Sequence, residues 1–432
     1  MRTRSGWRRS GSQQASSRSS GLDSHPWHLA LVVAAALAAA VRRLRSASRL
    51  LPRRGRERSL LAAFALTVLA TLFGLASASF AFRPLLEWDG WAIWALKAKA
   101  LYFTGGTAGP VFESTAYHAS HLDYPLFLPA LEAFAFRALD SADERLVHLQ
   151  LLGIAVAYIG ALWGLLADRV RTDVLALTLL ALASAPAVLS QLVSNYADLP
   201  LAFFVSLGLV SAVVWIEEGE AFPQIAYATV FFAAAAMTKN EGLLFVGCAY
   251  AALLAGTWTA RRSLIPVIAS LAATGLLLLP WRIYVAMHDT EGGEFDFARL
   301  THPSELGATA ERLPPTLTRL LGELIALRWG LIVPLAAIAL SATVLAGRRP
   351  VALFAVMWSA LTFVGLAAIY WISLLPIEVH LRNSASRTVS TLVVGLGSIA
   401  PLLLVPAAHR RPEDSREARL TSVARVAGRR FR

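Results

Sequence analysis

The sequence has little charge and almost no cysteine. Of its 432 residues only 16% are Asp, Glu, Lys or Arg, whereas 56% are hydrophobic. Soluble domains are about a quarter charged, so water is not the main solvent of this chain. The single cysteine, Cys248, excludes an intrachain disulfide and a cysteine-based metal cluster.

Long apolar runs recur along almost the whole chain. Several reach the ~20 residues that an α-helix needs to cross the ~30 Å hydrocarbon layer of a membrane. They predict an all-α, polytopic integral membrane protein with about 10 to 11 transmembrane helices. The expected segments lie near residues 27–41, 59–82, 146–167, 174–193, 199–216, 224–238, 241–258, 264–285, 324–346, 351–373 and 389–407. The first is short and rich in alanine, so it either spans the membrane or lies in the interface.

The net charge of +12 comes from arginines at both ends and in short connections, not from one stripe. This distribution argues against nucleic acid as a partner and is typical of topology signals. We expect a disordered basic tail at residues 1–25, a membrane domain at 26–407 and a basic cytoplasmic tail at 408–432. A secretory signal is the competing interpretation of the N-terminus. However, Arg42 and Arg43 follow the first apolar run where small cleavage-site residues should stand.

The apolar stretch from Tyr124 to Leu139 decides the topology. If it does not cross the membrane, the arginine-rich connections face the cytoplasm, as the positive-inside rule favours. We therefore predict a re-entrant or interfacial helix inside a first outer loop at about residues 83–145. All polar clusters that are candidates for a catalytic or binding role then lie on the outer side. They are Glu87 to Lys99, His118 to Tyr124, Asn195 to Asp198, Lys239 to Glu241, and His380 to Arg387.

The segment from Glu87 to Lys99 directly follows a predicted spanning helix and is rich in tryptophan, which favours the headgroup level. We predict an interfacial helix there, with an apolar stripe of Trp91, Trp94, Ala98 and Leu101. Glu87 and Asp89 are carboxylates at the membrane boundary. Because such groups are costly to desolvate, we expect them to have charged partners or a function. One of them can take a proton from an acceptor hydroxyl as a general base. A helix N-terminal cap by Asp89 is the structural alternative.

The second cluster contains His118, His121 and Asp123 at a spacing that allows three metal ligands. This spacing lacks the defined pattern of zinc motifs, so metal binding is the weaker interpretation. Asp123 and Tyr124 before Pro125 indicate a helix start that faces a cavity. A divalent metal ion is permitted by these residues but not required.

Three further charged residues lie close to membrane boundaries. Asp198 precedes a helix begun by Pro200, for which a purely structural role suffices as an alternative. Lys239 lies between two apolar runs, where a lysine indicates function and an anionic partner is expected. Glu241 is the candidate partner, which would make a structural ion pair.

His380, Arg382 and Arg387 lie before the last predicted helix. Arginines on an outer face run against the orientation bias and need another reason. The planar guanidinium binds phosphate through two parallel hydrogen bonds, so these residues are candidates to hold a phosphate at the membrane edge. A contact with lipid headgroups alone is the alternative.

The ordered motifs resemble the GT-C glycosyltransferases over roughly residues 60–400. They are Glu-Trp-Asp-Gly-Trp at 87–91, Asp-Tyr-Pro at 123–125, Ala-Asp-Leu-Pro at 197–200, Thr-Lys-Asn-Glu-Gly at 238–242 and His-Leu-Arg at 380–382. Within this superfamily the pattern is most similar to family 39, the branch with protein O-mannosyltransferases, aminoarabinose transferases and rhizobial lipopolysaccharide-core transferases.

The resemblance implies an inverting enzyme of the plasma membrane that uses a sugar on polyprenyl phosphate at the outer face. The acceptor would be a glycan, lipid or protein of the cell envelope. The family's catalytic acid in the first outer loop matches Asp89. Here Trp88 separates Glu87 from Asp89, whereas many relatives have adjacent acidic residues, so the division of work between the two stays open. Without a large C-terminal soluble domain, we expect acceptor recognition by the membrane part and the loop from Met287 to Leu321.

The resemblance also implies roles for the other charged residues in the transfer of a sugar from polyprenyl phosphate. Lys239, Arg382, Arg387 and His380 would stabilise the phosphate that leaves, and Asp123 and Asp198 would hold sugar hydroxyls or the acceptor. A secondary transporter or flippase of an anionic or glycolipid substrate is the main alternative, since intramembrane charges also mark transport paths. Transporter sites lie near the midplane between internal repeats, and the two halves of this sequence show no convincing repeat. A non-catalytic scaffold leaves the one-sided polar clusters unexplained.

Overall fold

The computed structural model describes residues 59–80, 82–218, 222–288, 295, 307 and 309–404. Every element in these ranges is a helix, apart from an isolated bridge between Phe295 and Ser373. The predicted tails at 1–25 and 408–432, the segment at 27–41 and most of the loop from Met287 to Leu321 lie outside the described residues.

Seven helices in the described ranges are long and apolar enough to cross a membrane, and two bent pairs bring the number to nine. The seven are α2 (Leu60–Phe80), α6 (Arg145–Leu166), α9 (Asp198–Glu218), α11 (Glu241–Thr259), α12 (Ile265–His288), α16 (Arg349–Ile372) and α17 (Ile377–Leu404). A shorter apolar helix, α10 (Phe222–Ala236), precedes α11. The prediction of an all-α polytopic membrane protein is confirmed, and each expected segment within the described residues coincides with one of these elements.

Two expected spans are bent instead of straight. The first consists of α7 (Thr172–Ser184) and α8 (Pro186–Leu192), which meet at 59°. Pro186 begins α8 and holds the preceding Ala185 in an extended conformation, so the α-helix cannot run through. In the second, the helices within Ala310–Trp329, including α14 (Leu313–Leu324), meet α15 (Ile332–Leu345) at 110°. Gly330, with φ of 55°, makes that turn.

The last helix begins twelve residues before the expected segment at 389–407. α17 starts at Ile377, so His380, Arg382 and Arg387 lie on a helix and not on a connection before it. Hydropathy alone assigns polar residues to loops, but the first turns of α17 carry polar side chains while keeping helical hydrogen bonds. The backbone N–H of His380, for example, donates to the carbonyl of Pro376.

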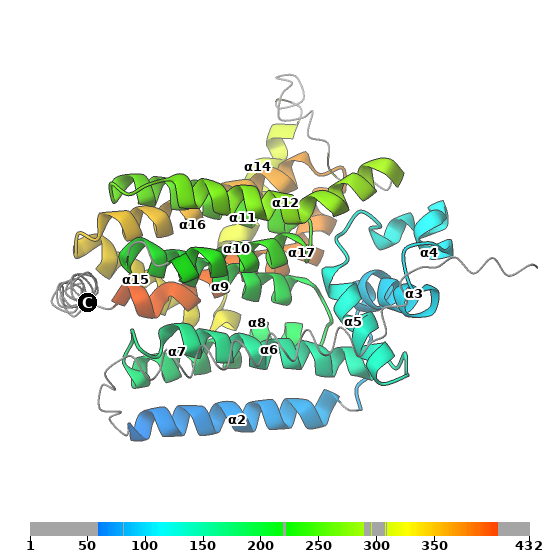
Figure 1. Ribbon diagram of the computed structural model, residues 1–432, viewed down its shortest axis with the longest axis horizontal. Coiled ribbons are helices and arrows are strands. Elements are labelled where there is room, and N and C mark those ends of the chain that lie inside the picture. Colours follow the sequence, from blue (N-terminus) through cyan, green and yellow to red (C-terminus); the bar gives the residue numbers. More distant parts are fainter. Residues whose placement is uncertain are drawn as a thin grey trace, which may run out of the picture. The chain divides into compact units, whose positions relative to one another are not determined.

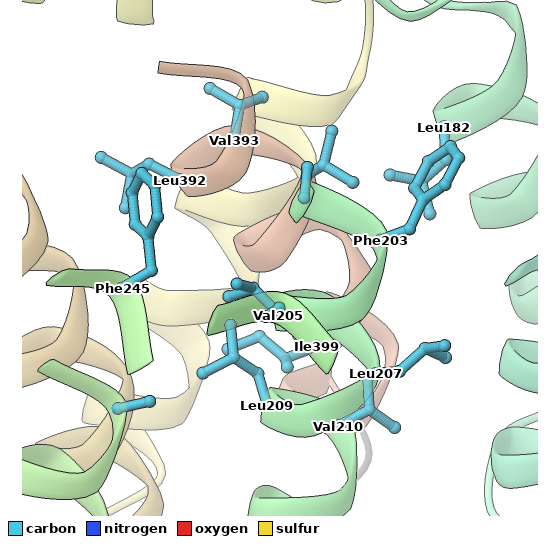
Figure 2. Close-up of a cluster of buried hydrophobic side chains, with 14 of the residues drawn as sticks. Leu182, Phe203, Val205, Leu207, Leu209, Val210, Phe245, Leu392, Val393 and Ile399 are labelled. Atoms are coloured by element: carbon cyan, nitrogen blue, oxygen red, sulfur yellow. The ribbon is translucent and has the colours of Figure 1, made fainter. Parts of the chain in front are cut away.

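The most buried span is α9, with 94% of its apolar window buried inside the protein. It is hydrophobic all round, as expected for a helix enclosed by other helices. α9 packs most extensively against α10 and α17 and also contacts α6 and α11, while α2 covers α6 and α7 (Figure 1). Figure 2 shows the core that α9 forms with neighbouring helices, including Val205, Leu209, Phe245, Leu392 and Ile399.

Short helices fill the connection between α2 and α6. They are η1 (Gly90–Ala95), α3 (Leu96–Thr104), α4 (Pro110–Glu113), η2 (Thr115–Ser120) and α5 (Phe127–Ala138). α5 has 12 residues, too few to cross the ~30 Å layer as a helix. This agrees with the prediction that the stretch from Tyr124 to Leu139 does not cross.

A helix forms where the sequence predicted an interfacial one, but it begins as a π-helix at η1. The predicted apolar stripe is therefore broken: Trp94 and Ala98 are buried, whereas Trp91 is 46% exposed. A π-helix holds more residues per turn than an α-helix, so residues spaced for one α-helical face point in different directions.

Close packing of α9 and α10 predicts that replacing glycine with alanine affects stability differently at two positions, Gly208 and Gly247. In Gly208→Ala the new Cβ would clash with the buried ring of Phe232, whereas nothing lies within 4 Å of a Cβ at Gly247 in α11. We expect Gly208→Ala to destabilise the protein by about 1–3 kcal/mol. Gly247→Ala should leave the melting temperature of detergent-solubilised protein unchanged or slightly raised. Equal melting temperatures for the two variants would contradict the packing described here.

Candidate active site

The turn that carries Asp89 is docked against the turn between α8 and α9. A Cβ on Gly90 would clash with the carbonyl oxygen of Ser194, so only glycine allows this approach. The side-chain amide of Asn195 donates to the carbonyl of Gly90 across 3.3 Å. The cap alternative for Asp89 is wrong, because the side chain makes no capping hydrogen bond at the start of η1. Its carboxylate is thereby left to interact with other parts of the chain.

A row of alternating charges runs from Asp89 through the interior of the protein. Arg387 of α17 contacts Oδ2 of Asp89 at 2.5 Å and Oδ2 of Asp198 at 3.8 Å. The Nζ of Lys239 lies 3.0 Å from Oδ1 of Asp198 and 2.8 Å from Oε1 of Glu241. Four of the five polar clusters therefore meet in space. We call the five residues that make these contacts the charge row: Asp89, Arg387, Asp198, Lys239 and Glu241.

The charge row is mostly shielded from solvent. The side chains of Asp198 and Lys239 are 5% and 9% exposed, and that of Asp89 is the most open at 27%. The guanidinium of Arg387 also lies 4.1 Å above the ring of Tyr196, which restricts its orientation. Removing one member of such a buried set leaves an uncompensated charge, at a cost of about 3–5 kcal/mol. The predicted partnership of Lys239 with Glu241 is present, and Asp198 is a second partner that the sequence did not indicate.

Asp123 and Tyr124 lie beside the charge row. The side-chain amide of Asn240 donates to Oδ2 of Asp123 at 2.6 Å, and the indole of Trp281 donates to the Asp123 carbonyl at 3.1 Å. The Nζ of Lys239 is 5.9 Å from the centre of the Tyr124 ring. Burial raises the pKa of Asp123 above its ordinary value. The two residues therefore lie next to the charge row in the turn before α5, which begins at Phe127 and not at the helix start that the sequence predicted.

Lys97 is a buried cation that the sequence analysis did not single out. Its Nζ lies 5.5 Å from the ring centres of both Trp94 and Tyr124, and it donates to the carbonyl of His121. Burial lowers the pKa of Lys97 to about 7, although the charge of Asp123 acts in the opposite direction. The sequence contained one indication that Lys97 is buried, because Lys97 lies one helical turn after Trp94, a residue of the predicted apolar stripe.

A cavity of about 270 Å³ opens next to Arg387. Its walls come from the first loop, α8, the α8–α9 turn, η5 (Leu327–Trp329) and α17. The lining residues are Glu87, Ala187, Ser190, Gln191, Ser194, Tyr196, Arg328, Asn383, Ser386 and Arg387. Only Glu87 and Arg387 were among the predicted site residues. The serines and amides of the bent α8 and of α17 carry no sequence motif that would have indicated them.

Besides Asp123 and Tyr124, three predicted residues lie outside the charge row. Glu87 pairs with Arg83 at 3.1 Å and reaches the cavity. His380 contacts Oγ of Ser373 through Nδ1 at 2.8 Å, whereas Arg382 is exposed. The structure therefore brings Asp89, Asp198, Lys239, Glu241 and Arg387 into direct contact and leaves these three at the margin.

The possible metal site gains no support within the described ranges, where no group of three or more His, Cys, Asp or Glu residues has the arrangement to hold a metal ion. His118 is exposed, and the ring of His121 stacks on Tyr124 with 4.7 Å between ring centres. Burial and the nearby charges of Lys97 and Lys239 lower the pKa of His121 to about 4, so this imidazole is neutral at neutral pH.

The fold defines the class of the protein: the chain is a polytopic membrane protein, and its fold is similar to that of solved ArnT structures. The solved structures that it resembles are crystal structures of ArnT from Cupriavidus metallidurans, one bound to undecaprenyl phosphate and one in the apo state. Each superposes with a TM-score of 0.52 at 18% sequence identity and covers 84% of this chain. The match spans 64% of the ArnT chain. The sequence matches no protein-family model and no curated protein.

Glu132 is a second residue that the sequence analysis missed. It lies in α5 and is 1% exposed. Burial raises its pKa to about 8, against an opposing contribution from the Asn195 amide. A carboxyl group at this place is therefore protonated at neutral pH, close to the residue that holds the turn of Asp89.

The raised pKa of Glu132 predicts a pH-dependent stability. Between pH 4.5 and pH 8 the carboxyl group is ionised in the unfolded chain but protonated in the folded protein. Its contribution to stability is present at low pH and falls by up to ~1.4 kcal/mol per pH unit across this window. We expect Glu132→Gln to remove this slope, so that the variant gains stability relative to wild type from pH 5 to pH 8. Thermal melts of both proteins across that range measure it, and parallel curves would contradict the buried neutral carboxyl.

Proposed function

We propose that this protein is an inverting glycosyltransferase that moves a sugar from a polyprenyl-phosphate donor to a cell-envelope glycan, lipid or protein. The reaction would take place on the outer face of the plasma membrane. The observation that carries this proposal is the charge row, in which a partly exposed carboxylate and two buried cations meet beside a cavity at one end of a membrane bundle. A solved structure with a similar fold is bound to undecaprenyl phosphate, and from this likeness we infer a polyprenyl-phosphate ligand for this chain.

Asp89 is the proposed general base. Arg387 binds its Oδ2 through a charge-assisted hydrogen bond, which holds the carboxylate in a fixed orientation. The other carboxylate oxygen, Oδ1, is proposed to receive the proton of the acceptor hydroxyl. As that proton leaves, the acceptor oxygen bonds to the anomeric carbon. The bond from this carbon to the phosphate oxygen breaks on the opposite side, which inverts the configuration.

The departing polyprenyl phosphate takes the electron pair and gains negative charge. Arg387 and Lys239 are the proposed cations that stabilise this charge inside the protein, and Arg382 would act at the exposed edge. The half-buried His380 would contribute a hydrogen bond and not a charge. In the structure the two buried cations are bound to carboxylates, so a bound phosphate would share them with Asp89, Asp198 and Glu241. This sharing avoids leaving a buried cation unpaired after the product departs.

The remaining predicted residues have positioning roles in this proposal. Asp123 and Tyr124 form a wall held by Asn240 and Trp281, and they would orient the sugar or the acceptor. Asp198 and Glu241 hold Lys239 from two sides. Glu87 faces the cavity and pairs with Arg83, so it is better placed to bind substrate than to share the role of base with Asp89.

Replacing the proposed base tests the function. We expect Asp89→Asn to lower sugar transfer by about 10²–10⁴-fold, because the amide cannot accept the proton. The readout is mass spectrometry of cell-envelope glycans from source cells that lack the protein and are supplied with each variant. The sugar residue missing without the protein identifies the donor sugar and its linkage.

The matched control is Asp168→Asn, at an exposed aspartate beyond the far end of α6. It should restore the glycan fully, and both variants should insert and elute from size-exclusion chromatography as wild type does. Full restoration by Asp89→Asn would remove this residue from the mechanism.

The phosphate role of the cations predicts a separate kinetic effect. Lys239→Ala and Arg382→Ala should raise the KM for the polyprenyl-phosphate donor, and the buried Lys239 should have the larger effect. Removing Lys239 also takes the cation from Glu241 and leaves Asp198 with only the longer contact to Arg387, so the Lys239 variant should melt at a lower temperature. Steady-state kinetics with varied donor concentration measures this. An unchanged donor KM in both variants would leave the phosphate role without support.

A further inference from the structure

The cavity beside Arg387 has walls that the proposed mechanism does not use. Ser190 and Gln191 come from α8, and Asn383 and Ser386 come from α17. α8 is the second half of a span bent by 59°, so its polar side chains line a cavity although the sequence there continues an apolar segment. The cavity is therefore a built feature of the broken span, with its own set of hydroxyl and amide groups.

Three buried polar atoms around this cavity have no hydrogen-bond partner among the described atoms. They are Oε1 of Gln191, Oε2 of Glu87 and Nε of Arg387. Gln191 is only 6% exposed, so its side-chain carbonyl is removed from bulk water. Leaving such atoms unpaired is unfavourable, and a ligand that supplies both donors and acceptors would satisfy all three.

The charges of the walls already have partners of opposite sign. Glu87 pairs with Arg83 at 3.1 Å, and Arg328 pairs with Glu323 at 2.8 Å. Arg387 is shared between Asp89 and Asp198. A ligand at this place therefore needs no net charge of its own. Hydroxyl groups, which both donate and accept, fit this lining better than a phosphate, which only accepts when ionised.

We propose that this cavity binds one uncharged sugar ring of the substrate and that Gln191 determines which sugar is accepted. The side-chain carbonyl of Gln191 accepts a hydrogen bond from a ring hydroxyl, and Glu87 accepts from a second one. The volume of about 270 Å³ lies just below the ~300 Å³ at which pockets for larger ligands begin, which suits a single ring. A site built to bind a hydroxyl rejects analogues that lack it, because its polar atoms are then left unpaired.

The inference rests on the proposed function, but binding can be measured without turnover. The probes are neutral methyl glycosides of common hexoses and pentoses, with methyl glucuronide and inorganic phosphate as charged probes. Saturation-transfer NMR titrations would use the full chain in lipid nanodiscs. We expect at least one neutral glycoside to bind wild type and to bind Gln191→Met roughly tenfold more weakly or worse. The charged probes should not compete.

The control is Gln150→Met in α6, which removes another amide oxygen without a hydrogen-bond partner that does not line the cavity. It should bind the glycoside as wild type does. Asn383→Leu, at an exposed position of α17, tests the opposite wall without altering the buried core and should also weaken binding. The Gln191 variant should further lose its discrimination between the glycoside and the matching deoxy-glycoside.

Three results would overturn the inference: no neutral glycoside binds wild type, a charged probe displaces the glycoside, or Gln191→Met binds with unchanged affinity. The two proposals fail separately. If Asp89→Asn transfers sugar normally while Gln191 still controls glycoside binding, the catalytic proposal is wrong and the sugar site stands. If Asp89→Asn is inactive and Gln191→Met binds normally, only the sugar site is wrong.

Discussion

Arg387 lies between two carboxylates that are far apart in the sequence, Asp89 and Asp198, and the arrangement of the site depends on this contact. A guanidinium has five N–H donors in a rigid plane, so one residue can bind both acids and stack on Tyr196 at the same time. A buried charge without such partners would be strongly destabilising. The fold must therefore keep the first loop, α9 and α17 together for Arg387 to remain where it is.

The membrane bundle provides that constraint. α9 is enclosed by α10, α17, α6 and α11, and its first residue is Asp198. Since α17 packs against α9 along its length, the position of Arg387 relative to Asp198 follows from helix packing and not from the ion pair alone. The turn of Asp89 is then attached by Gly90 and Asn195, and a side chain at residue 90 would prevent this close approach. Rigid spans thus hold two members of the site, and a short docked turn adds the third.

The bent spans divide the polar groups into two neighbouring environments. On one side of Arg387 are fully charged groups that are suited to phosphate and proton transfer. On the other side is a cavity lined by serines and amides, formed where α8 turns away from α7 at Pro186. Such a division suits the proposed transfer of a neutral sugar ring from an ionic leaving group, because the two parts of that substrate require different partners.

By itself the sequence determined the membrane class, the approximate spans and most of the charged residues of the site. Hydrophobic length and the scarcity of charge are properties of a chain in lipid, and each of Asp89, Asp198, Lys239 and Arg387 was conspicuous because charge near a bilayer is costly. Only the tertiary structure decided that Asp198 pairs with Lys239, that α17 begins at Ile377 and that Lys97, Glu132 and Gln191 are buried. These facts depend on which helices are neighbours. Local sequence patterns record which face of a helix is apolar, but not which polar group from a distant segment will lie opposite it.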